Sequence, residues 1–156
     1  MAINLRLEGA PELIRALGRS PETLAQEQLR AMTASLLLVE ADARRNVAHD
    51  TRQLMNSITH RVRQEPQGLI GQVGPSVRYG LYVERGTRPH FPPVAALRGW
   101  ARRHGVSPYA VQRAIGRRGT RARPFLLPAF EKHVARIIRL FAAAGARVVV
   151  RIGEVT

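Results

Sequence analysis

The sequence predicts an α+β fold in which a small, mostly antiparallel sheet packs against two long helices, with a short helical hairpin and an arginine-rich loop. Three observations support this prediction. Two long segments, 21–48 and 125–144, place apolar residues every three or four positions, while short runs elsewhere alternate apolar and polar residues. The predicted helices also outnumber the strands and do not alternate with them one for one, which is an α+β pattern.

The first predicted elements are a strand and a long helix. Residues 3–8 alternate as in a half-buried strand, and Pro11 suits the start of a short helix that ends near Leu17. The tripeptide at 20–22, Ser-Pro-Glu, has the N-cap, N1 proline and acidic first turn of a helix that should end near Ala48. The apolar stripe of this helix consists of Leu29, Met32, Leu36, Val39, Ala43 and Val47.

A β-hairpin should follow the long helix. Residues 57–64 alternate apolar and polar side chains, 66–68 have the composition of a turn, and 69–73 form a second apolar run. A short amphipathic helix is then predicted over 77–85, and Gly86 is its predicted left-handed C-cap. The residues that share one face of this helix, and are predicted to be buried, are Tyr79, Tyr82 and Val83. The same geometry predicts that Glu84 and Arg85 point elsewhere.

The next segment should contain two short helices. Prolines at 89, 92 and 93 predict an extended connector, and Gly105 separates a helix near 94–104 from another near 108–116. Residues 116–123 then form a basic, glycine-containing loop. Together, residues 94–123 are a basic helical hairpin with its loop.

A second long helix and a closing strand end the chain. The helix is expected from about Phe125 to Ala144, with Gly145 as its stop. Its inner face should consist of Phe130, Val134, Ile137, Ile138 and Phe141. Residues 147–152 are predicted as a closing strand, with Val148, Val150 and Ile152 on one side.

Composition excludes several classes of protein. The 156 residues contain no cysteine, which excludes disulfide scaffolds, Cys-based zinc sites and thiol nucleophiles. No run of about 18 apolar residues is present, and Arg6 and Glu8 interrupt the first apolar stretch, so neither a membrane-spanning helix nor a signal peptide is expected. The length predicts a single domain over residues 1–156, of soluble, intracellular type.

Positive charge is concentrated in one part of the chain. The formal net charge is +14, yet no acidic residue lies between Glu84 and Glu131, and that window carries ten arginines. Guanidinium groups bind carboxylates and phosphates bidentately, and a block of one sign repels itself unless an acidic surface lies close by. The candidate contact residues are Glu84, Arg85, Arg88, Arg98, Arg102, Arg103, Arg113, Arg117, Arg118, Arg121 and Arg123.

Catalytic chemistry is not indicated. The glycines at 68, 71 and 74 are interpreted as turn glycines rather than a phosphate loop, because no Lys-Ser/Thr pair follows them. The five histidines lack metal-ligand spacing, Glu40 and Asp42 point to different helix faces, and Glu84 is interpreted as an ion-pair partner of nearby arginines. The sequence therefore predicts neither a catalytic residue nor a metal or cofactor site.

The basic block leaves four interpretations open. It can contact nucleic-acid phosphates, an acidic membrane surface, acidic surfaces of neighbouring subunits, or solvent alone. Membrane binding needs bulky apolar residues opposite the charges, and residues 97–104 supply few of them. Residues 94–116 imitate a helix-turn-helix with arginines placed for phosphates, although short helical hairpins are common in other contexts.

Three segments resemble the tail-completion (neck) proteins of long-tailed bacteriophages. Residues 49–58 (His-Asp-Thr-Arg-Gln-Leu-Met-Asn-Ser-Ile) resemble the family's Thr-Gly-x-Leu-x-x-Ser-Ile segment after the long helix. Residues 79–87 (Tyr-Gly-Leu-Tyr-Val-Glu-Arg-Gly-Thr) are similar to Tyr-Ala-x-Tyr-Val-Glu-Phe-Gly-Thr, and residues 123–130 to the Pro-Phe-Leu-x-Pro-Ala opening of the last helix. Arg52 stands where the family usually has glycine, and Arg85 where it usually has an aromatic residue.

The resemblance covers roughly residues 20–145 and implies a structural virion protein at the head–tail junction. Such proteins look like ring-forming subunits, often hexamers, that join the portal or connector side of the capsid to the tail tube, as tail-completion or terminator proteins. The implied partners are further copies of the chain and the neighbouring connector, stopper and tail-tube proteins. Contact of the block at 98–123 with the passing genomic DNA is the alternative.

Overall fold

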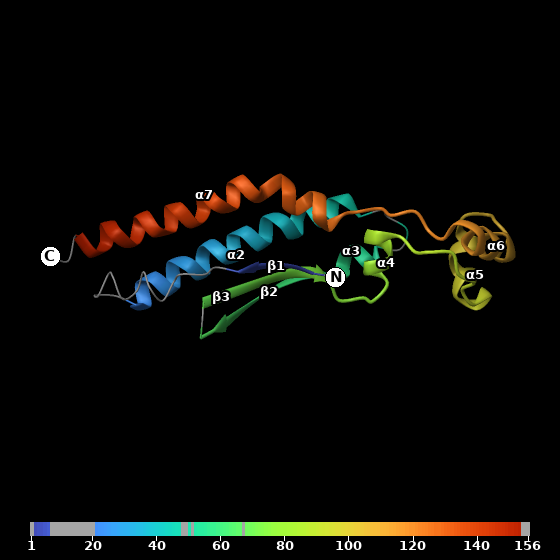
Figure 1. The fold of residues 1–156 in the computed structure, drawn as a ribbon, viewed down its shortest axis with the longest axis horizontal. Coiled ribbons are helices and arrows are strands. Elements are labelled where there is room, and N and C mark those ends of the chain that lie inside the picture. Colours follow the sequence, from blue (N-terminus) through green and yellow to red (C-terminus); the bar gives the residue numbers. More distant parts are fainter. Residues whose placement is uncertain (1, 7–20, 48–49, 51, 67, 154–156) are drawn as a thin grey trace. The chain divides into compact units, whose positions relative to one another are not determined.

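The computed structural model describes residues 2–6, 21–47, 50, 52–66 and 68–153 (Figure 1). The chain divides into two compact units. Unit 1 comprises residues 1–77 and 125–156 and holds the sheet, the two long helices and one short helix. Unit 2 comprises residues 78–124 and holds three short helices. Unit 2 contains the basic segment at 94–123 that the sequence singled out within a predicted single domain.

Unit 1 contains a three-stranded antiparallel sheet in the order β1-β3-β2. β1 is Ile3–Arg6, β2 is Ile58–Glu65 and β3 is Gly68–Pro75. β2 and β3 form the predicted hairpin, with Glu65 opposite Gly68 beside the turn, while β1 pairs with the other edge of β3. The α+β prediction, with a small sheet packed on two long helices, is confirmed.

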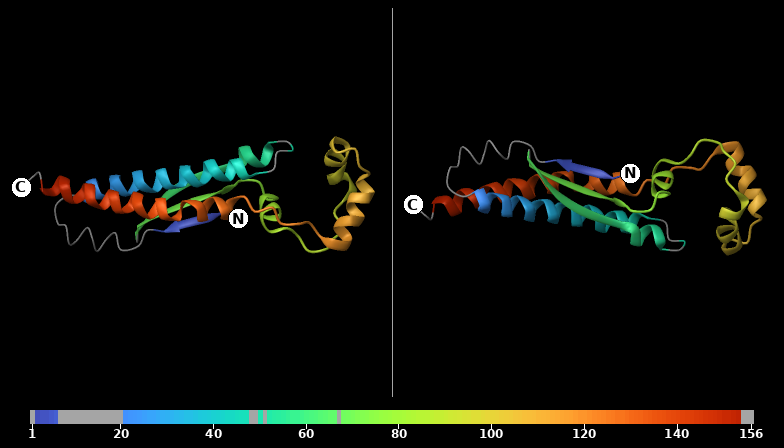
Figure 2. Two further views of the ribbon diagram at one scale, coloured as in Figure 1. Left: turned by 90° about the horizontal axis from the view of Figure 1, so that it is seen from above. Right: turned by 90° about the horizontal axis from the view of Figure 1, so that it is seen from below.

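Helix α2 (Pro21–Asn46) packs against both the sheet and helix α7 (Leu126–Gly153). The two helices run antiparallel, and the sheet lies along one side of the pair (Figure 2). The predicted apolar stripe of α2 is buried except at Leu29, which is 46% exposed. Because α2 is covered from two directions, its buried arc also takes in Leu24, Glu27, Ala31, Ser35, Glu40 and Asp42. The predicted Ser20 cap and the helix at 11–17 lie outside the described residues.

Close approach of α2 to the sheet requires a glycine in β3. A Cβ atom at Gly71 would lie 2.5 Å from Met32 Sδ and 2.9 Å from Leu36 Cδ1. Gly71 lies within β3, paired with Leu5 and Val62, so its interpretation as a turn glycine is wrong. The bare backbone at this position lets the long side chains of α2 fill the space above the strand.

Helix α3 (Gln53–Ser57) leads into β2 and starts from a residue in the left-handed conformation. Its N-cap is Arg52, which has φ 58° and ψ −3°. Among the described residues, Arg52 alone has a positive φ without being a glycine. The amide of Asn56 donates to the Arg52 carbonyl at 2.9 Å and closes the first turn. An L-residue in this conformation costs roughly 1–2 kcal/mol.

Helix α7 continues past Gly145 to the end of the described chain, so the predicted strand at 147–152 is wrong. The run of β-branched residues suggested a strand. In the helix, however, Val148 lies on the buried face, and Arg147 Nε donates to Glu27 Oε2 on α2 at 2.7 Å. Packing against α2 therefore outweighs the local β propensity.

The buried face of α7 is rotated from the predicted one. Ile138 is 64% exposed, and Phe130, Val134 and Phe141 are only half-buried, while Ile137 is buried as predicted. The fully buried residues are Leu126, Ala129, Ile137, Ala144 and Val148. With half-buried His133 among them, they recur at multiples of three or four residues, as one helix face requires.

Two buried carboxylates of α2 tie it to α7 near the two ends of the pair. Glu27 accepts from Arg147 at 2.7 Å and from Arg30 at 2.8 Å, and the hydrogen bond from Arg147 lowers its pKa. Asp42 lies 2.8 Å from Lys132 Nζ and 2.7 Å from His133 Nε2. The hydrogen bond from Lys132, supported by that from His133, lowers the pKa of Asp42 to about 2 against the opposing effect of burial.

A third buried carboxylate ties α2 to the sheet. Glu40 Oε2 lies 2.5 Å from His60 Nδ1 on β2, and its other oxygen lies 2.7 Å from Arg44 Nη2. Arg44 also donates to the carbonyl of Ile58 at 2.7 Å. Glu40 and Asp42 thus point to different faces of α2, as predicted from the sequence.

Unit 2 consists of three short helices and their connections. α4 is Gly80–Arg85, α5 is Val94–Arg103 and α6 is Pro108–Arg118. α5 and α6 pack on each other as the predicted helical hairpin. Across the described parts of both units, no helix combines the length and the apolar character needed to cross a membrane.

Asp42→Asn should destabilise the protein by about 1–3 kcal/mol at pH 7, because the buried carboxylate that holds Lys132 and His133 against α2 loses its charge. Asp42 has a lowered pKa, so its contribution is complete above its ordinary pKa of 3.8 and is lost as the pH falls through about 2. Urea unfolding between pH 2 and pH 7 should therefore show a shallower acid limb in the variant. The control is Glu65→Gln, which removes an exposed carboxylate and should change stability by less than about 0.5 kcal/mol. If Asp42→Asn and the wild type lost stability equally as the pH falls to 2, Asp42 would not be the carboxylate responsible.

Arg52→Gly should stabilise the protein by about 0.5–1 kcal/mol, because glycine relieves the left-handed strain. The strain energy removed exceeds the free energy lost because glycine makes the unfolded chain more flexible. Thermal unfolding would show this as a rise of a few degrees in Tm. Gln53→Gly, at the first helical residue of α3, is the matched control and should destabilise. Equal losses of stability in the two variants would contradict the prediction.

Candidate interaction surface

Unit 2 carries all the candidate contact residues named from the sequence. Glu84 and Arg85 lie on α4, and Arg88 lies on the segment leaving it. The helical hairpin carries Arg98, Arg102 and Arg103 on α5 and Arg113, Arg117 and Arg118 on α6. Arg121 and Arg123 lie on the returning segment. Arg117 and Arg118 were predicted in a loop, but they form the last turn of α6 because the helix continues to its cap at Gly119.

Burial separates Glu84 from the ten arginines. Every one of those arginines is exposed, whereas Glu84 is 5% exposed. The predicted burial of Tyr79 and Tyr82 is wrong: Tyr82 is 56% exposed and Tyr79 is partly exposed, while Val83 is half-buried. The inward face of α4 therefore includes Glu84 instead of the tyrosines. The desolvation of Tyr79 still raises the pKa of its phenol above 10, which keeps it neutral.

Two glycines let the chain segments on either side of the hairpin meet. Thr87 and Thr120 form an antiparallel bridge, with amide-to-carbonyl hydrogen bonds of 3.0 and 3.2 Å and hydroxyl groups 3.0 Å apart. A Cβ atom at Gly86 would lie 2.4 Å from the Thr120 carbonyl, and one at Gly119 would lie 1.9 Å from the Thr87 carbonyl. Both glycines have φ 70° with extended ψ, so Gly86 ends α4 without the predicted left-handed cap geometry.

Further backbone contacts hold these segments to the helices. The amide of His90 donates to the Ile115 carbonyl at 3.4 Å, and the side chain of Gln112 donates to the Pro92 carbonyl at 2.9 Å. The Arg123 amide donates to the Val83 carbonyl at 2.8 Å. The hairpin is thus anchored at its base by hydrogen bonds along both of its chain segments.

The α5–α6 hairpin has almost no core of its own. Ala101 is the buried residue of α5, and α6 has none. Large apolar side chains of unit 2 are instead exposed, and they comprise Tyr79, Tyr82, Phe91, Trp100, Val106 and Tyr109. Trp100 stacks on His104 with ring centroids 4.1 Å apart, which fixes the indole on the surface of α5. Exposed aromatic side chains beside arginines are typical of protein-binding surfaces.

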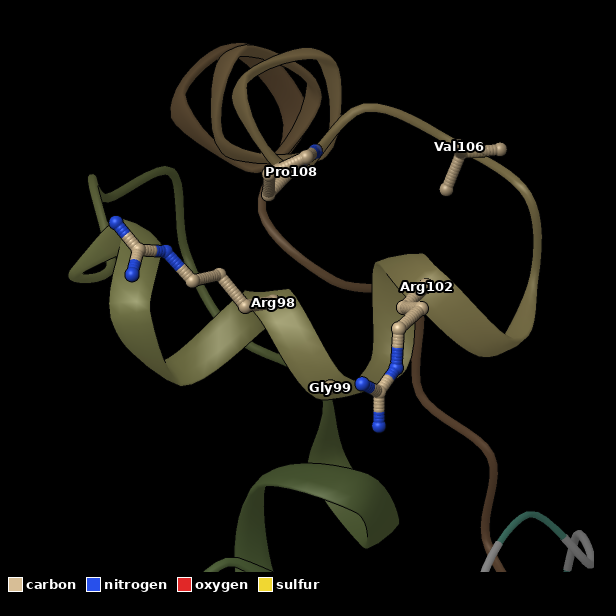
Figure 3. Close-up of a pocket in the computed structure, with 5 residues that line it drawn as sticks. All are labelled: Arg98, Gly99, Arg102, Val106 and Pro108. Atoms are coloured by element: carbon tan, nitrogen blue, oxygen red, sulfur yellow. The ribbon is translucent and has the colours of Figure 1, made fainter.

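A groove of about 500 Å³ lies between the two helices of the hairpin. It is lined by Arg98, Gly99, Arg102, Val106 and Pro108. Figure 3 shows Arg98 and Arg102 on α5, with Pro108 and Val106 across from them, and the two guanidinium groups extending in different directions. The groove is therefore lined by the apolar side chains of Val106 and Pro108 and by two arginines of α5.

The charge of unit 2 is strongly one-sided. Residues 78–124 contain eleven arginines and one glutamate, which is a formal net charge of +10. Chemically, such a surface can bind anionic groups, and its exposed rings and aliphatic side chains can cover apolar ones. Among the described residues, no three His, Asp or Glu side chains gather where a metal ion would fit.

Sequence reasoning located the charge but missed the bridge and the groove. Thr120 and the groove residues Val106 and Pro108 carry no motif that marks them, and the Gly-Thr pair at 86–87 did not indicate a bridge to Thr120. The available signal was the unusual placement of aromatic residues: five of the eight in the chain lie within residues 78–124. A segment that supplies aromatics without a long apolar stripe indicates side chains that are not buried in its own core.

Gly119→Ala should open the base of the hairpin, because its Cβ atom would overlap the Thr87 carbonyl. Amide hydrogen exchange at Thr87 and Thr120 should accelerate by at least about tenfold. Gly105→Ala is the matched control, since φ is 64° there and a Cβ atom would meet nothing within 4 Å. Similar exchange rates at the bridge in both variants would show that positive φ, rather than the close approach, makes Gly119 necessary.

Comparison of the chain with protein-family models, with curated proteins and with solved structures finds no match to any of them.

Proposed function

We propose that this protein is a structural subunit of the neck of a long-tailed phage particle, a ring-forming protein that joins the capsid connector to the tail tube. The observation that carries the proposal is the occurrence, in order, of three segments that resemble tail-completion proteins, at 49–58, 79–87 and 123–130. The geometry of each segment supports it, because the positions that the resemblance specifies have defined structural roles.

The first segment supports the proposal through burial and backbone conformation. Leu54, Ser57 and Ile58 are the residues that match the Leu-x-x-Ser-Ile pattern, and all three are buried. Arg52 replaces the usual glycine, and its φ of 58° lies in the left-handed region, which glycine adopts more readily than other residues do. The position therefore keeps the geometry of a glycine although the residue has changed.

The other two segments support it in the same way. Gly86 and Thr87 match the Gly-Thr of the second pattern, and they form the glycine approach and the threonine bridge at the base of the hairpin. Phe125, Leu126 and Ala129 match the third pattern and are each no more than 1% exposed. The residues that match the patterns thus lie at tight turns and in the core, where proteins that share a fold keep the same residue types.

Unit 2 is the proposed contact surface within the assembly. A ring needs a heterologous interface that closes, and such interfaces combine aromatic and arginine side chains. The exposed arginines and rings of α5 and α6 supply both. Repulsion within a surface of net charge +10 is relieved when it meets acidic neighbours.

Imaging of assembled particles at side-chain resolution tests the proposal directly. The chain is expected in a closed ring, with six copies, at the junction of head and tail, and with aspartate and glutamate side chains of adjacent subunits facing Arg98 to Arg123. Finding the arginines directed into open solvent, or the chain absent from the particle, would contradict the proposal.

Charge reversal on α6 should block incorporation into particles. Arg117→Glu with Arg118→Glu should reduce the copies per particle by about tenfold or more, because like charges would then face each other across the interface. Quantitative mass spectrometry of purified particles measures this reduction. The control is Arg61→Glu with Arg63→Glu, which reverses two exposed charges on β2 of unit 1 and should leave incorporation within about twofold.

Contact with the genome is the second candidate function, favoured by exposed Trp100 and Tyr109 among the arginines, since bases stack on such rings. It ranks second because phosphate contacts in the lumen of a ring would retain passing DNA. Gel-shift titrations of arbitrary duplex DNA distinguish the two. Tight binding whose log K falls by about 0.9 per phosphate contact for each tenfold rise in salt would favour DNA contact.

A further inference from the structure

We propose that the groove between α5 and α6 binds an acidic segment of a partner protein, in which one apolar side chain is flanked by carboxylates. This inference rests on the proposed function and names the chemistry of the neighbour that unit 2 contacts. The groove residues are Arg98, Gly99, Arg102, Val106 and Pro108.

The wall of the groove is held in place before any ligand binds. The Val106 amide donates to the Ala101 carbonyl at 3.0 Å, and the Gly105 amide donates to the Arg102 carbonyl at 3.4 Å. With Gly105 at φ 64°, these bonds form a Schellman motif that ends α5 and places Val106 back over the helix. A preformed wall lowers the entropic cost of binding.

The middle of the groove has room for a side chain because Gly99 has none. A Cβ atom at Gly99 would meet only the flexible end of Arg103, at 3.5 Å. Val106 and Pro108 face this space and present carbon atoms rather than hydrogen-bond donors (Figure 3). An apolar side chain is therefore the group that fits here.

The sides of the groove select for carboxylates. Arg98 and Arg102 lie one turn apart on α5, and their guanidinium groups extend in different directions rather than toward one point (Figure 3). In these orientations the two groups can bind separate carboxylates, such as those on the two sides of one apolar residue. The sequence supplies no carboxylate between Glu84 and Glu131 to neutralise them locally.

These features favour a protein segment over a nucleic acid. Phosphates would satisfy the arginines, but bases bind by stacking on aromatic rings, and none of the residues that line the groove is aromatic. A protein segment satisfies both, with the apolar residue as its anchor and the carboxylates as its charged rim.

The test uses the full chain and a fluorescein-labelled peptide, Gly-Ser-Asp-Glu-Leu-Asp-Glu-Ser-Gly, in fluorescence anisotropy titrations. Saturable binding is expected with Kd of about 10–100 μM at low salt. Gly99→Leu fills the groove without changing the charge and should weaken binding by at least about tenfold. Replacing the peptide's leucine by glycine should weaken binding by about fivefold or more, because the anchor is lost.

Matched variants separate the groove from general electrostatics. Arg98→Ala with Arg102→Ala should weaken peptide binding about tenfold, whereas Arg113→Ala with Arg117→Ala removes the same charge outside the groove and should change it less than about threefold. Ala114→Leu adds an exposed leucine on α6 and is the control for Gly99→Leu. Circular dichroism establishes that each variant is folded.

Either a failure of peptide binding at the groove or a preference of the groove for nucleic acid would overturn the inference. The first is the absence of saturable peptide binding up to about 1 mM, or binding that Gly99→Leu leaves unchanged. The second is tighter binding of a labelled 20-nucleotide single strand that displaces the peptide and is lost in Arg98→Ala with Arg102→Ala. If the protein forms a ring in imaged particles but does not bind the peptide, this inference alone is refuted. If the protein binds the peptide at the groove but is absent from particles, the neck assignment alone is refuted.

Discussion

Helix α2 carries three buried carboxylates, and the arrangement of unit 1 depends on how their charge is neutralised. Glu27 and Asp42 bind cations at the two ends of α7, and Glu40 binds His60 on the sheet. Breaking such a buried pair leaves an uncompensated charge, whereas replacing both partners by apolar groups can be neutral. The pairs therefore act mainly by selecting one arrangement of α2, α7 and the sheet from the others that apolar packing alone would tolerate.

Unit 2 follows the opposite principle. Its charge is not neutralised within the segment, its hairpin buries little, and the two chain segments at the base of the hairpin are joined by backbone contacts at Gly86 and Gly119. Glycine-dependent approaches and a short bridge hold a small element in place without a core. Residues that would form a core in an independent domain remain at the surface, where a partner can cover them. The two units thus divide the roles of stability and recognition.

Much of the fold could be predicted from local sequence. The period of apolar residues identified both long helices and the hairpin, and Gly105 marked the end of α5. Where two competing signals met, the prediction was wrong: the valines of 147–152 favour a strand locally, but the helix is continued by Arg147 reaching Glu27. The contact partner lies 120 positions away in the chain, so no local pattern reveals it.

The sequence by itself determined where the charge lies, that residues 85–130 contain no carboxylate, and which segments are long helices. Only the tertiary structure decided that Glu84 is buried while Tyr82 is exposed, and that Arg98 and Arg102 flank a groove. The physical reason is that helical periodicity tells which residues share a face but not which face is covered. That choice depends on neighbours brought together by the fold, such as the two segments that meet at Thr87 and Thr120.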